Sequence, residues 1–439
     1  MIDRDAAWLA RAAGGRVVAR ATGGSGPRKA VVDSRQLGAG DLFVGLPGSQ
    51  ADGGRFAAAA LEAGAWGVLV AEEHAQGLSG GAVIAAADPL SALQGLARAW
   101  RRELGARVVG ITGSTGKTST KDILAALLGQ RLRTHRNHEN LNTEIGLPLS
   151  VLDAPPGTEA LVLEMAMRGE GQIAELTAIA EPDVGVIVNV GPVHLELLGT
   201  VERVAAVKAE LIRDLEPGAA CVVPAEERLL EAHLRDDLDT WTFGPGGQVS
   251  LVSLEAGLAR IEARGEQVEL ELPFSEAHNV MNTLAAVAAG RALDVTPSGR
   301  IDARFSSLRG EVVELPGGVT VVNDCYNANP MSMRAALEHL AATPAERRIA
   351  VLGTMAELGE AAAGYHREIG SLAAERGIDV LVTVGQAALP YSEGFAGRAY
   401  SVATPEEAGA LLEEVAAPGD RVLVKGSRSV GLERMLAGR

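Results

Sequence analysis

Cysteine is nearly absent from this sequence, which contains only Cys221 and Cys325 among 439 residues. Two cysteines so far apart argue against a disulfide framework and against a cysteine-rich metal site, so both are expected to be plain thiols in the core or near the site. No apolar run reaches the ~18 residues that a membrane-spanning helix needs. The N-terminus, MIDRDAAWLARAAGG, has early acidic residues and no clean apolar core, unlike an export signal. We therefore expect a cytoplasmic protein without a transmembrane segment.

Basic residues are outnumbered, with 40 Lys and Arg against 56 Asp and Glu, which gives a formal net charge of −16. The acidic residues are distributed along the chain, so the surface repels phosphate backbones, and we expect no nucleic-acid partner. Hydrophobic residues make up 47% and charged residues 22%, which is typical of a globular protein. A chain of this length predicts two to four domains.

A glycine-rich stretch lies between a predicted strand and a predicted helix, and reads Val108-Val109-Gly110-Ile111-Thr112-Gly113-Ser114-Thr115-Gly116-Lys117-Thr118-Ser119-Thr120. The amides of such a turn and the helix N-terminus together form an anion site. Gly113 and Gly116 permit close approach, Lys117 supplies a cation for β and γ phosphates, and the Thr118 hydroxyl can bind Mg²⁺. Ile111 stands where the common phosphate-loop spacing has glycine, so this is a shortened G-x-x-G-K-T loop. It predicts nucleotide binding but does not specify the reaction.

The order of apolar runs predicts an α/β protein with three domains. We expect a small N-terminal α/β domain over residues 1–105, a central doubly wound domain with a mostly parallel sheet and the phosphate loop over 106–308, and a Rossmann-like C-terminal domain over 309–439. A helix from Leu90 to Leu104 ends at Gly105, and alternating residues over 249–273 predict an antiparallel patch on the central sheet. The other expected elements are strands at 29–33, 66–70, 107–112, 160–165, 184–190, 219–223, 318–323, 348–353, 379–384 and 421–425, and helices at 56–63, 117–129, 172–180, 201–215, 278–293, 331–342, 362–376 and 405–416.

Several polar residues stand at or near the ends of predicted strands, and each has a functional and an ordinary interpretation. Glu164 follows a strand beside the phosphate loop, where a carboxylate completes the coordination of nucleotide-bound Mg²⁺; the alternative is a solvated carboxylate. His194 could be an ordinary turn histidine, and Lys208 an ordinary solvated helix lysine. In the N-terminal domain, Arg35 beside Ser34 could bind a phosphate or cap a turn.

These groups recur in order within motifs that resemble those of the Mur ligase family, ATP-dependent enzymes that form amide bonds. The motifs are Gly113-Ser114-Thr115-Gly116-Lys117-Thr118, Asn140-Leu141-Asn142-Thr143-Glu144-Ile145-Gly146-Leu147-Pro148, Glu164-Met165, Asn189-Val190-Gly191-Pro192-Val193-His194-Leu195-Glu196, Lys208 and His278-Asn279-Val280-Met281-Asn282. Three more resemble the branch of the family that adds D-alanyl-D-alanine: Asp324-Cys325-Tyr326-Asn327-Ala328-Asn329-Pro330-Met331-Ser332-Met333, Met355-Ala356-Glu357-Leu358-Gly359 and Lys425-Gly426-Ser427-Arg428-Ser429. The Asp-Asn-Pro-Arg signature of the diamino-acid-adding relative is absent. The resemblance covers essentially the whole chain.

The resemblance implies a ligase that adds D-alanyl-D-alanine to UDP-N-acetylmuramoyl-tripeptide through an acyl phosphate, in peptidoglycan precursor synthesis. Its partners would be these two substrates, and a monomer is expected. The implied cofactors are ATP and Mg²⁺ at two sites, the first with Thr118 and Glu164, the second with His194 and a carbamoylated Lys208. The N-terminal domain would bind the UDP substrate, the central domain ATP, and the C-terminal domain would close on ATP and bind the dipeptide.

Matching positions assign further roles by resemblance. The ATP site would comprise Gly113, Ser114, Thr115, Gly116, Lys117, Thr118, Ser119, Asn279, Asn282, Arg309 and Asp324. The substrate-binding residues would be Ser34, Arg35, Asn140, Asn142, Asn327, Asn329, Ser332, Lys425 and Arg428. The catalytic residues would be Lys117, Glu164, His194 and Lys208.

The sequence departs from the usual family pattern at Thr143, Ala166, Ser307, Leu308 and Thr354, which affects loop geometry and substrate preference and removes no group that the chemistry requires. A phosphate-loop kinase or simple NTPase is one alternative function, and a nucleotide-binding scaffold without turnover is another. The shortened loop and the polar clusters outside the central domain argue against the first. The intact set of Lys117, Glu164, His194, Lys208 and Asp324 argues against the second.

Overall fold

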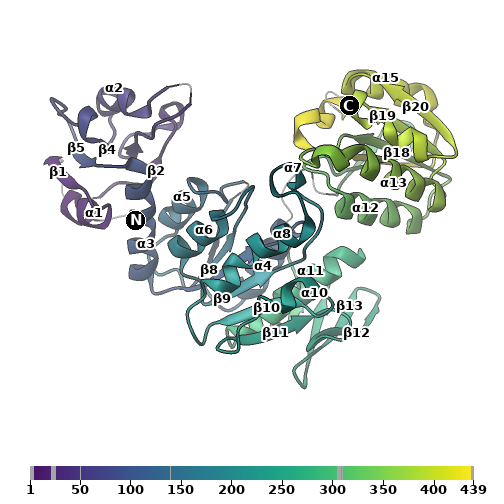
Figure 1. Cartoon of the computed structure of the whole chain (residues 1–439), viewed down its shortest axis with the longest axis horizontal. Coiled ribbons are helices and arrows are strands. Elements are labelled where there is room, and N and C mark those ends of the chain that lie inside the picture. Colours follow the sequence, from purple (N-terminus) through teal and green to yellow (C-terminus); the bar gives the residue numbers. More distant parts are fainter. Residues whose placement is uncertain are drawn as a thin grey trace.

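The computed structural model describes residues 4–20, 26–49, 51–138, 140–303, 308 and 310–436. It contains three β-sheets with helices packed against them, which confirms the predicted α/β class. Figure 1 shows three lobes, with the N-terminal lobe (residues before 89) and the C-terminal lobe (residues 310–436) on either side of a central lobe (residues 106–303). Among the described residues, no helix combines the length and the apolar character that crossing a membrane requires.

The N-terminal lobe has a five-stranded sheet in the order β1-β5-β4-β3-β2, in which β1 pairs antiparallel with β5 and the other neighbours pair parallel. The apolar side chains of the inner strands are buried on both faces, as a covered parallel sheet requires. Its elements are α1 (Ala6–Ala12), β1 (Arg16–Ala19), β2 (Ala30–Val31), β3 (Leu42–Val44), α2 (Ala57–Glu62), β4 (Gly67–Ala71) and β5 (Ala82–Ala86).

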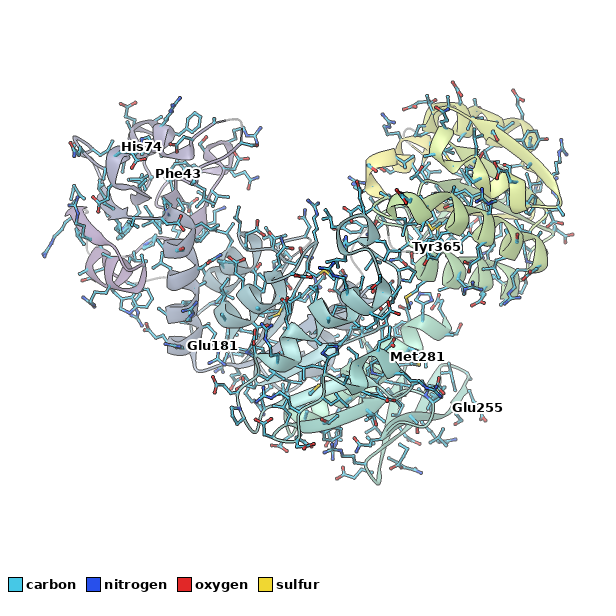
Figure 2. The ribbon with its side chains drawn as sticks, viewed as in Figure 1. Phe43, His74, Glu181, Glu255, Met281 and Tyr365 are labelled. Carbon is cyan, nitrogen blue, oxygen red and sulfur yellow. The ribbon has the colours of Figure 1, made fainter. Side chains whose placement is uncertain are left out.

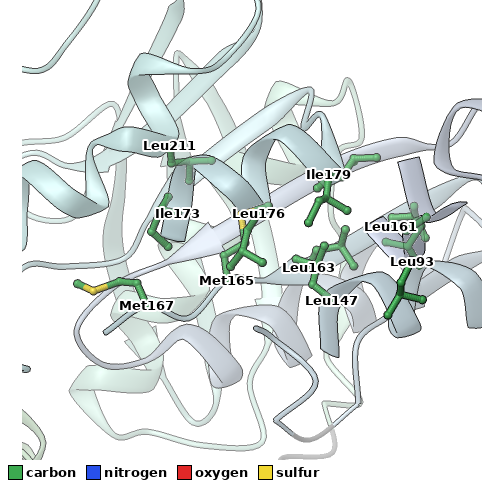
Figure 3. Packing of buried hydrophobic residues seen from close by; sticks show 14 of the residues in the cluster. Leu93, Leu147, Leu161, Leu163, Met165, Met167, Ile173, Leu176, Ile179 and Leu211 are labelled. Atoms are coloured by element: carbon green, nitrogen blue, oxygen red, sulfur yellow. The ribbon is translucent and has the colours of Figure 1, made fainter. Parts of the chain in front are cut away.

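Helix α3 (Pro89–Leu104) connects the N-terminal and central lobes and packs against both. The Asp88 side chain caps its start, and Gly105 ends it with a left-handed φ of 62°. Its Trp100 indole N–H donates to the Ala154 carbonyl at 3.0 Å, and Arg101 Nε donates to the Ala180 carbonyl at 2.9 Å. Figure 3 shows Leu93 in one apolar cluster with residues of the central lobe. The helix predicted to close the first domain is therefore also part of the central core.

The central sheet has ten strands in the order β15-β14-β13-β12-β11-β10-β9-β6-β8-β7. The strands from β7 to β12 pair parallel, while β12–β13 and β13–β14 pair antiparallel, which confirms the predicted antiparallel patch. Helices α4 and α11 cover one face, and α5, α6, α8 and α9 cover the other. The elements are β6 (Arg107–Thr112), α4 (Lys117–Gly129), β7 (Thr134–Arg136), α5 (Gly146–Asp153), β8 (Ala160–Glu164), α6 (Gln172–Ala180), β9 (Val184–Ile187), α7 (Leu195–Leu198), α8 (Val201–Lys208), α9 (Glu210–Arg213), β10 (Ala220–Pro224), α10 (Arg228–Glu231), β11 (Asp239–Phe243), β12 (Val249–Glu255), β13 (Leu258–Ala263), β14 (Glu266–Glu271), α11 (Ala277–Ala292) and β15 (Gly299–Arg300).

Two predicted elements of the central lobe differ in the structure. The helix expected over 201–215 is two helices, α8 and α9. The buried Glu210 carboxylate in α9 accepts the N–H groups of Gly171 and Ala174 at the start of α6. These hydrogen bonds fix α9 against the start of α6, so the chain does not continue as one helix. The strand expected over 184–190 ends at Ile187, because the following residues turn to hydrogen-bond the phosphate loop.

The C-terminal lobe has a six-stranded sheet in the order β16-β17-β21-β18-β19-β20, parallel except for β16. Helices α12 and α13 pack on one face and α15 on the other, which confirms the predicted second doubly wound unit. Its elements are β16 (Glu311–Leu315), β17 (Val319–Asn323), α12 (Pro330–Ala342), β18 (Arg347–Gly353), α13 (Ala362–Glu375), β19 (Val380–Val384), α14 (Pro390–Gly394), β20 (Arg398–Val402), α15 (Pro405–Val415) and β21 (Asp420–Lys425). Cys221 and Cys325 are free and buried, which agrees with the first of the two places expected for them.

Candidate active site

The phosphate loop runs from the end of β6 into α4, and its shape is held by the turn after β9. Asn189 accepts the Ser114 N–H at 3.1 Å through its carbonyl and the Thr115 N–H at 2.9 Å through Oδ1. The Ser114 hydroxyl exchanges hydrogen bonds with the backbone of Gly191. Since these groups already have partners, Ser114 and the Thr115 amide support the loop, and the N-terminal amides of α4 are the ones aimed at a phosphate.

Gly116 begins α4 with a φ of 77°, a conformation that favours glycine. A Cβ there would overlap Oδ1 of Asn282 on α11, so the loop and α11 are in direct contact. Asn282 also donates to Asn279 Oδ1 at 3.4 Å, so the two asparagines expected near adenine lie together beside the loop. The Lys117 ammonium donates to the Gly113 carbonyl at 2.7 Å, which folds this cation over the loop.

Glu164 ends β8 directly opposite Thr118. The Thr118 hydroxyl donates to Glu164 Oε2 at 2.8 Å, and Asn142 Nδ2 donates to Oε1 at 2.9 Å. Asn142, expected to bind substrate, thus orients this carboxylate, and it also lines the cavity between the two lobes. The hydroxyl and carboxylate oxygens are the hard ligands that Mg²⁺ prefers, so the pair fits that ion. No group of three His, Cys, Asp or Glu side chains with metal-site geometry occurs among the described residues.

Sequence reasoning missed a buried charge cluster beneath Glu164. The side chain of Lys121 is fully buried, with its ammonium 3.8 Å from Glu164 Oε2 and 3.7 Å from Asp122 Oδ1. Asp122 in turn pairs with Arg136 on β7. Two cations therefore balance two carboxylates inside the lobe. The sequence does contain a signal for this cluster, because the charged residues Lys121 and Asp122 interrupt the apolar face of α4.

Lys208 is 2% exposed on α8, so the interpretation of a solvated lysine is wrong. Burial, and after it repulsion by Lys117, lowers the pKa of the Lys208 ammonium well below its usual value. This environment favours the neutral amine. A neutral amine is the form of lysine that can react to carry an additional chemical group.

His194 contacts the C-terminal lobe. Its Nδ1 is hydrogen-bonded to Oε2 of Glu357, and this contact lowers the pKa of the Glu357 carboxyl below its usual value. His194 has a φ of 54° and Glu357 a φ of 63°, so both residues adopt the left-handed conformation that non-glycine residues rarely adopt. The backbone N–H of Glu196 adds a hydrogen bond to the Glu357 carbonyl at 3.2 Å.

The turns after β17 and β21 form the polar cluster of the C-terminal lobe. Lys425 Nζ lies 2.7 Å from Asp324 Oδ2 and 3.0 Å from the Asn327 carbonyl. Asn329 and Ser332 form a capping box at the start of α12, so their side chains stabilise the helix, and both residues also line the cavity between the two lobes. Arg428 pairs with Glu433 at 2.8 Å, and 58% of its side chain is exposed.

The N-terminal lobe contributes no residue to this cluster among those described. Asp33 caps the 3₁₀ turn Ser34–Gln36, and its hydrogen bonds with Arg35 lower the pKa of Asp33 to about 2. The Arg35 side chain is 88% exposed and pairs with Asp33 at 2.8 Å, so it stabilises the residue that caps this turn. Figure 2 shows His74 in the N-terminal lobe, away from Met281, which lines the cavity and lies on the side of the central lobe that is nearer the C-terminal lobe. The predicted site residue Arg309 lies outside the described residues.

A cavity of about 1520 Å³ lies between the central and C-terminal lobes and brings most of the predicted site residues together. Ser34 and Arg35 do not line it. The predicted residues that do are Gly113, Ser114, Thr115, Gly116, Lys117, Thr118, Ser119, Asn140, Asn142, Glu164, His194, Lys208, Asn279, Asn282, Asp324, Asn327, Asn329, Ser332, Lys425 and Arg428.

Three family models match consecutive parts of the chain. They are described as Mur ligase family, catalytic domain, over residues 31–98; Mur ligase middle domain, over 111–290; and Mur ligase, glutamate ligase domain, over 308–428. The chain belongs to the Mur ligase family.

Similar Mur ligases include curated and solved proteins that align along most of the chain. The UDP-N-acetylmuramoyl-tripeptide–D-alanyl-D-alanine ligase of Bacillus subtilis is 35% identical, with 92% of this chain and 91% of the relative covered. The structure of MurF from Acinetobacter baumannii is 27% identical with a TM-score of 0.89, covering 99% of this chain and 98% of that one. The structure of MurF from Thermotoga maritima in complex with ADP is 32% identical with a TM-score of 0.82, covering 93% and 96%.

Proposed function

We propose that this Mur ligase uses ATP to join D-alanyl-D-alanine to UDP-N-acetylmuramoyl-tripeptide, giving the pentapeptide nucleotide, ADP and phosphate in peptidoglycan precursor synthesis. The observation that supports it most strongly is the near full-length similarity to relatives with this name, with all three lobes aligned. The predicted phosphate-loop, carboxylate and C-terminal motifs line one cavity, which is what a reaction between three substrates requires. A reaction that consumes ATP and a UDP-linked peptide belongs in the cytoplasm.

The chemistry has two steps. First, a terminal carboxylate oxygen of the tripeptide attacks the γ-phosphorus of ATP, the bond to the ADP oxygen breaks, and an acyl phosphate forms. Second, the free amine of the dipeptide attacks the acyl carbon, the bond to phosphate breaks, and the nitrogen loses a proton to give the amide. Since three anionic groups must meet, the protein chiefly supplies placement and charge neutralisation.

Each lobe has a part in this proposal. Residues 106–308 would bind ATP, with Lys117 and the α4 N-terminus on its phosphates and Asn279 and Asn282 beside the adenine. Residues 309–439 would close on ATP and hold the dipeptide. Residues 1–105 would hold the UDP end of the peptide nucleotide. The exposed Arg35 would leave its pairing with Asp33 and bind the diphosphate of the nucleotide.

The first Mg²⁺ would be held by Thr118 and Glu164, whose oxygens lie 2.8 Å apart. His194 and Lys208 would hold the second, and Lys208 fits this role only after carbamoylation, because a carbamate presents oxygens where an ammonium would repel the ion. When bound, Mg²⁺ would neutralise the phosphate charge that opposes the approach of a carboxylate.

The test is a matrix of phosphate-release assays with purified enzyme, ATP and Mg²⁺. We expect ADP and phosphate only when both UDP-N-acetylmuramoyl-tripeptide and D-alanyl-D-alanine are present, with a pentapeptide nucleotide detected by mass spectrometry. Release that depends on glutamate or a diamino acid would assign another ligase activity of the family. A phosphorylated product without an amide would indicate a kinase.

A further inference from the structure

The motif Met355–Gly359 has no part in the reaction described above, although its residues Ala356 and Glu357 line the cavity. It follows β18 in the middle of the C-terminal sheet and places the side chain of Glu357 at the junction with the central lobe. In open parallel sheets, ligands bind at the carboxyl ends of the strands, which is where this turn lies.

The backbone of the turn is held in an uncommon conformation against the central lobe. Glu357 has a φ of 63°, and its carbonyl accepts the Glu196 N–H at 3.2 Å. A Cβ on Gly359 would lie 3.1 Å from the Glu196 Cα, so the two backbones are in close contact. A non-glycine residue persists in this conformation only where its surroundings enforce it, and such residues concentrate at functional sites.

The carboxylate of Glu357 faces the cavity between two nitrogen-bearing groups. It is hydrogen-bonded to Nδ1 of His194 and lies 3.9 Å from Arg168 Nε, and 44% of its side chain is exposed. The other carboxylate that the C-terminal turns bring to this cavity, Asp324, is already paired with the buried Lys425 at 2.7 Å. Glu357 is therefore an accessible anion at the meeting point of the two lobes.

A cation stands on the adjacent turn. The Ser427 N–H donates to the Thr354 carbonyl at 2.9 Å, and the Ala356 N–H donates to Ser427 Oγ at 2.9 Å, which ties together the turns after β18 and β21. Arg428 follows directly and lines the same cavity; its guanidinium is paired with Glu433 at 2.8 Å, and 58% of its side chain is exposed. One turn thus presents a carboxylate and its neighbour a guanidinium.

This arrangement of charges is complementary to a short zwitterion. The incoming dipeptide has an ammonium at one end and a carboxylate at the other, and both lose hydration when they enter a cavity between lobes. A carboxylate is the natural partner of the first, and an arginine fork the natural partner of the second. We infer that Glu357 binds the amino group of the incoming dipeptide and that Arg428 on the neighbouring turn receives its carboxylate. The inference rests on the proposed function and adds a substrate-binding residue to it.

The test compares two ligands of the full enzyme, D-alanyl-D-alanine as substrate and propionyl-D-alanine, which has no amino group, as a competitive inhibitor. Glu357→Gln keeps the size of the side chain and its hydrogen bonding to His194 but removes the charge. We expect it to raise KM for the dipeptide roughly 10- to 100-fold, the usual effect of one charge-assisted hydrogen bond, while the inhibition constant of propionyl-D-alanine changes less than about 3-fold. Glu357→Asp should recover part of the loss.

Two controls separate this role from a structural one and from the proposed function itself. Glu360→Gln removes an exposed charge from the same turn and should change neither constant. Hydroxylamine can replace the dipeptide as the nucleophile that attacks the acyl phosphate, so ADP formation from ATP and the UDP-linked tripeptide in its presence should match wild type in the Glu357→Gln variant, because no dipeptide takes part. Equal weakening of both ligands, or an unchanged KM, would overturn the inference. A wild-type enzyme that forms no trapped acyl phosphate would refute the proposed function instead.

Discussion

Met331, the second residue of α12, lies directly on Gly191 in the turn that supports the phosphate loop. A Cβ on Gly191 would overlap the Met331 sulfur, so a hydrogen atom at this position is what lets the C-terminal lobe approach. Asn329 Nδ2 reaches the Ser114 carbonyl at 3.4 Å beside this contact. The two lobes that would hold ATP and the dipeptide thus meet at the loop itself.

The first prediction concerns this contact. Gly191→Ala should lower kcat/KM at least roughly 10-fold, because packed interiors do not absorb an added methyl group without displacement and the displaced element here is the C-terminal lobe. Gly191 has an ordinary φ, so strain of its own backbone is not the cause. The measurement is steady-state ADP formation with all substrates.

Two variants control this result. Gly129→Ala adds a methyl group at the end of α4, where nothing lies within 4 Å of a Cβ, and should leave kcat/KM unchanged. Adding Met331→Ala to Gly191→Ala should recover part of the activity, since it makes room. A fully active Gly191→Ala enzyme would show that the lobes need not meet here.

The second prediction concerns the hydroxyl beside Glu164. Thr118→Val should lower kcat at least roughly 100-fold, because it removes one of the two oxygens proposed to hold Mg²⁺ and leaves Glu164 Oε2 without its donor. Thr120→Val on the same helix is the matched control, since that buried hydroxyl has no hydrogen-bond partner in the described structure. Equal activity of the two variants would show that the Thr118 hydroxyl has no part in catalysis.

The third prediction concerns the buried cluster of Lys121, Asp122 and Glu164. Lys121→Met should lower the free energy of unfolding by about 3 kcal/mol, because it leaves two carboxylates to share the charge of Arg136. Lys29→Met, at an exposed lysine, should change it by less than about 0.5 kcal/mol. Urea titration measures both. Combining Lys121→Met with Glu164→Gln should cost less than the sum of the single changes, and simple additivity would contradict the coupling.

The fourth prediction concerns pH. His366 is buried on α13, and its Nε2 accepts the Met355 N–H at 3.0 Å, which requires an unprotonated nitrogen. Burial lowers the pKa of His366, so below the usual pKa of about 6.5 the unfolded chain binds a proton that the folded chain does not. Stability contributed by this group is therefore complete above that pH and declines as the pH falls below it.

His366→Gln tests this, because glutamine can still accept a hydrogen bond and does not titrate. The loss of unfolding free energy between about pH 7.5 and pH 5.5 should be smaller in the variant than in wild type, as measured by urea titration at both pH values. All other titratable groups are the same in the two proteins, so their contribution to the pH dependence of the unfolding free energy cancels in this comparison. An identical loss in both proteins would exclude His366 as a source of acid sensitivity.

Local sequence signals predicted the elements around the loop well. Strand Arg107–Thr112 and helix Lys117–Gly129 have the predicted bounds, because a long apolar period and a glycine turn specify them without outside help. The strand Asp239–Phe243 was missed although Trp241 and Phe243 alternate with polar residues, since one short strand gives a weak signal.

The relationships between lobes could not be predicted from local patterns. The contact between His194 and Glu357 joins residues 163 positions apart, and the packing of Met331 on Gly191 depends on how two separate cores are oriented. For the same reason, local patterns did not indicate that Asn142 hydrogen-bonds Glu164 or that Asn329 caps the start of α12. Their partners become apparent only once the chain is folded.

The central claim is that ATP activates the peptide carboxylate directly, and isotope transfer tests it most directly. UDP-N-acetylmuramoyl-tripeptide labelled with ¹⁸O in its reacting carboxylate would be incubated with the enzyme, ATP, Mg²⁺ and D-alanyl-D-alanine, and both products analysed by mass spectrometry. An acyl phosphate predicts one ¹⁸O in the released phosphate and the other in the new amide. Unlabelled phosphate, or the absence of a pentapeptide nucleotide, would contradict the proposed reaction.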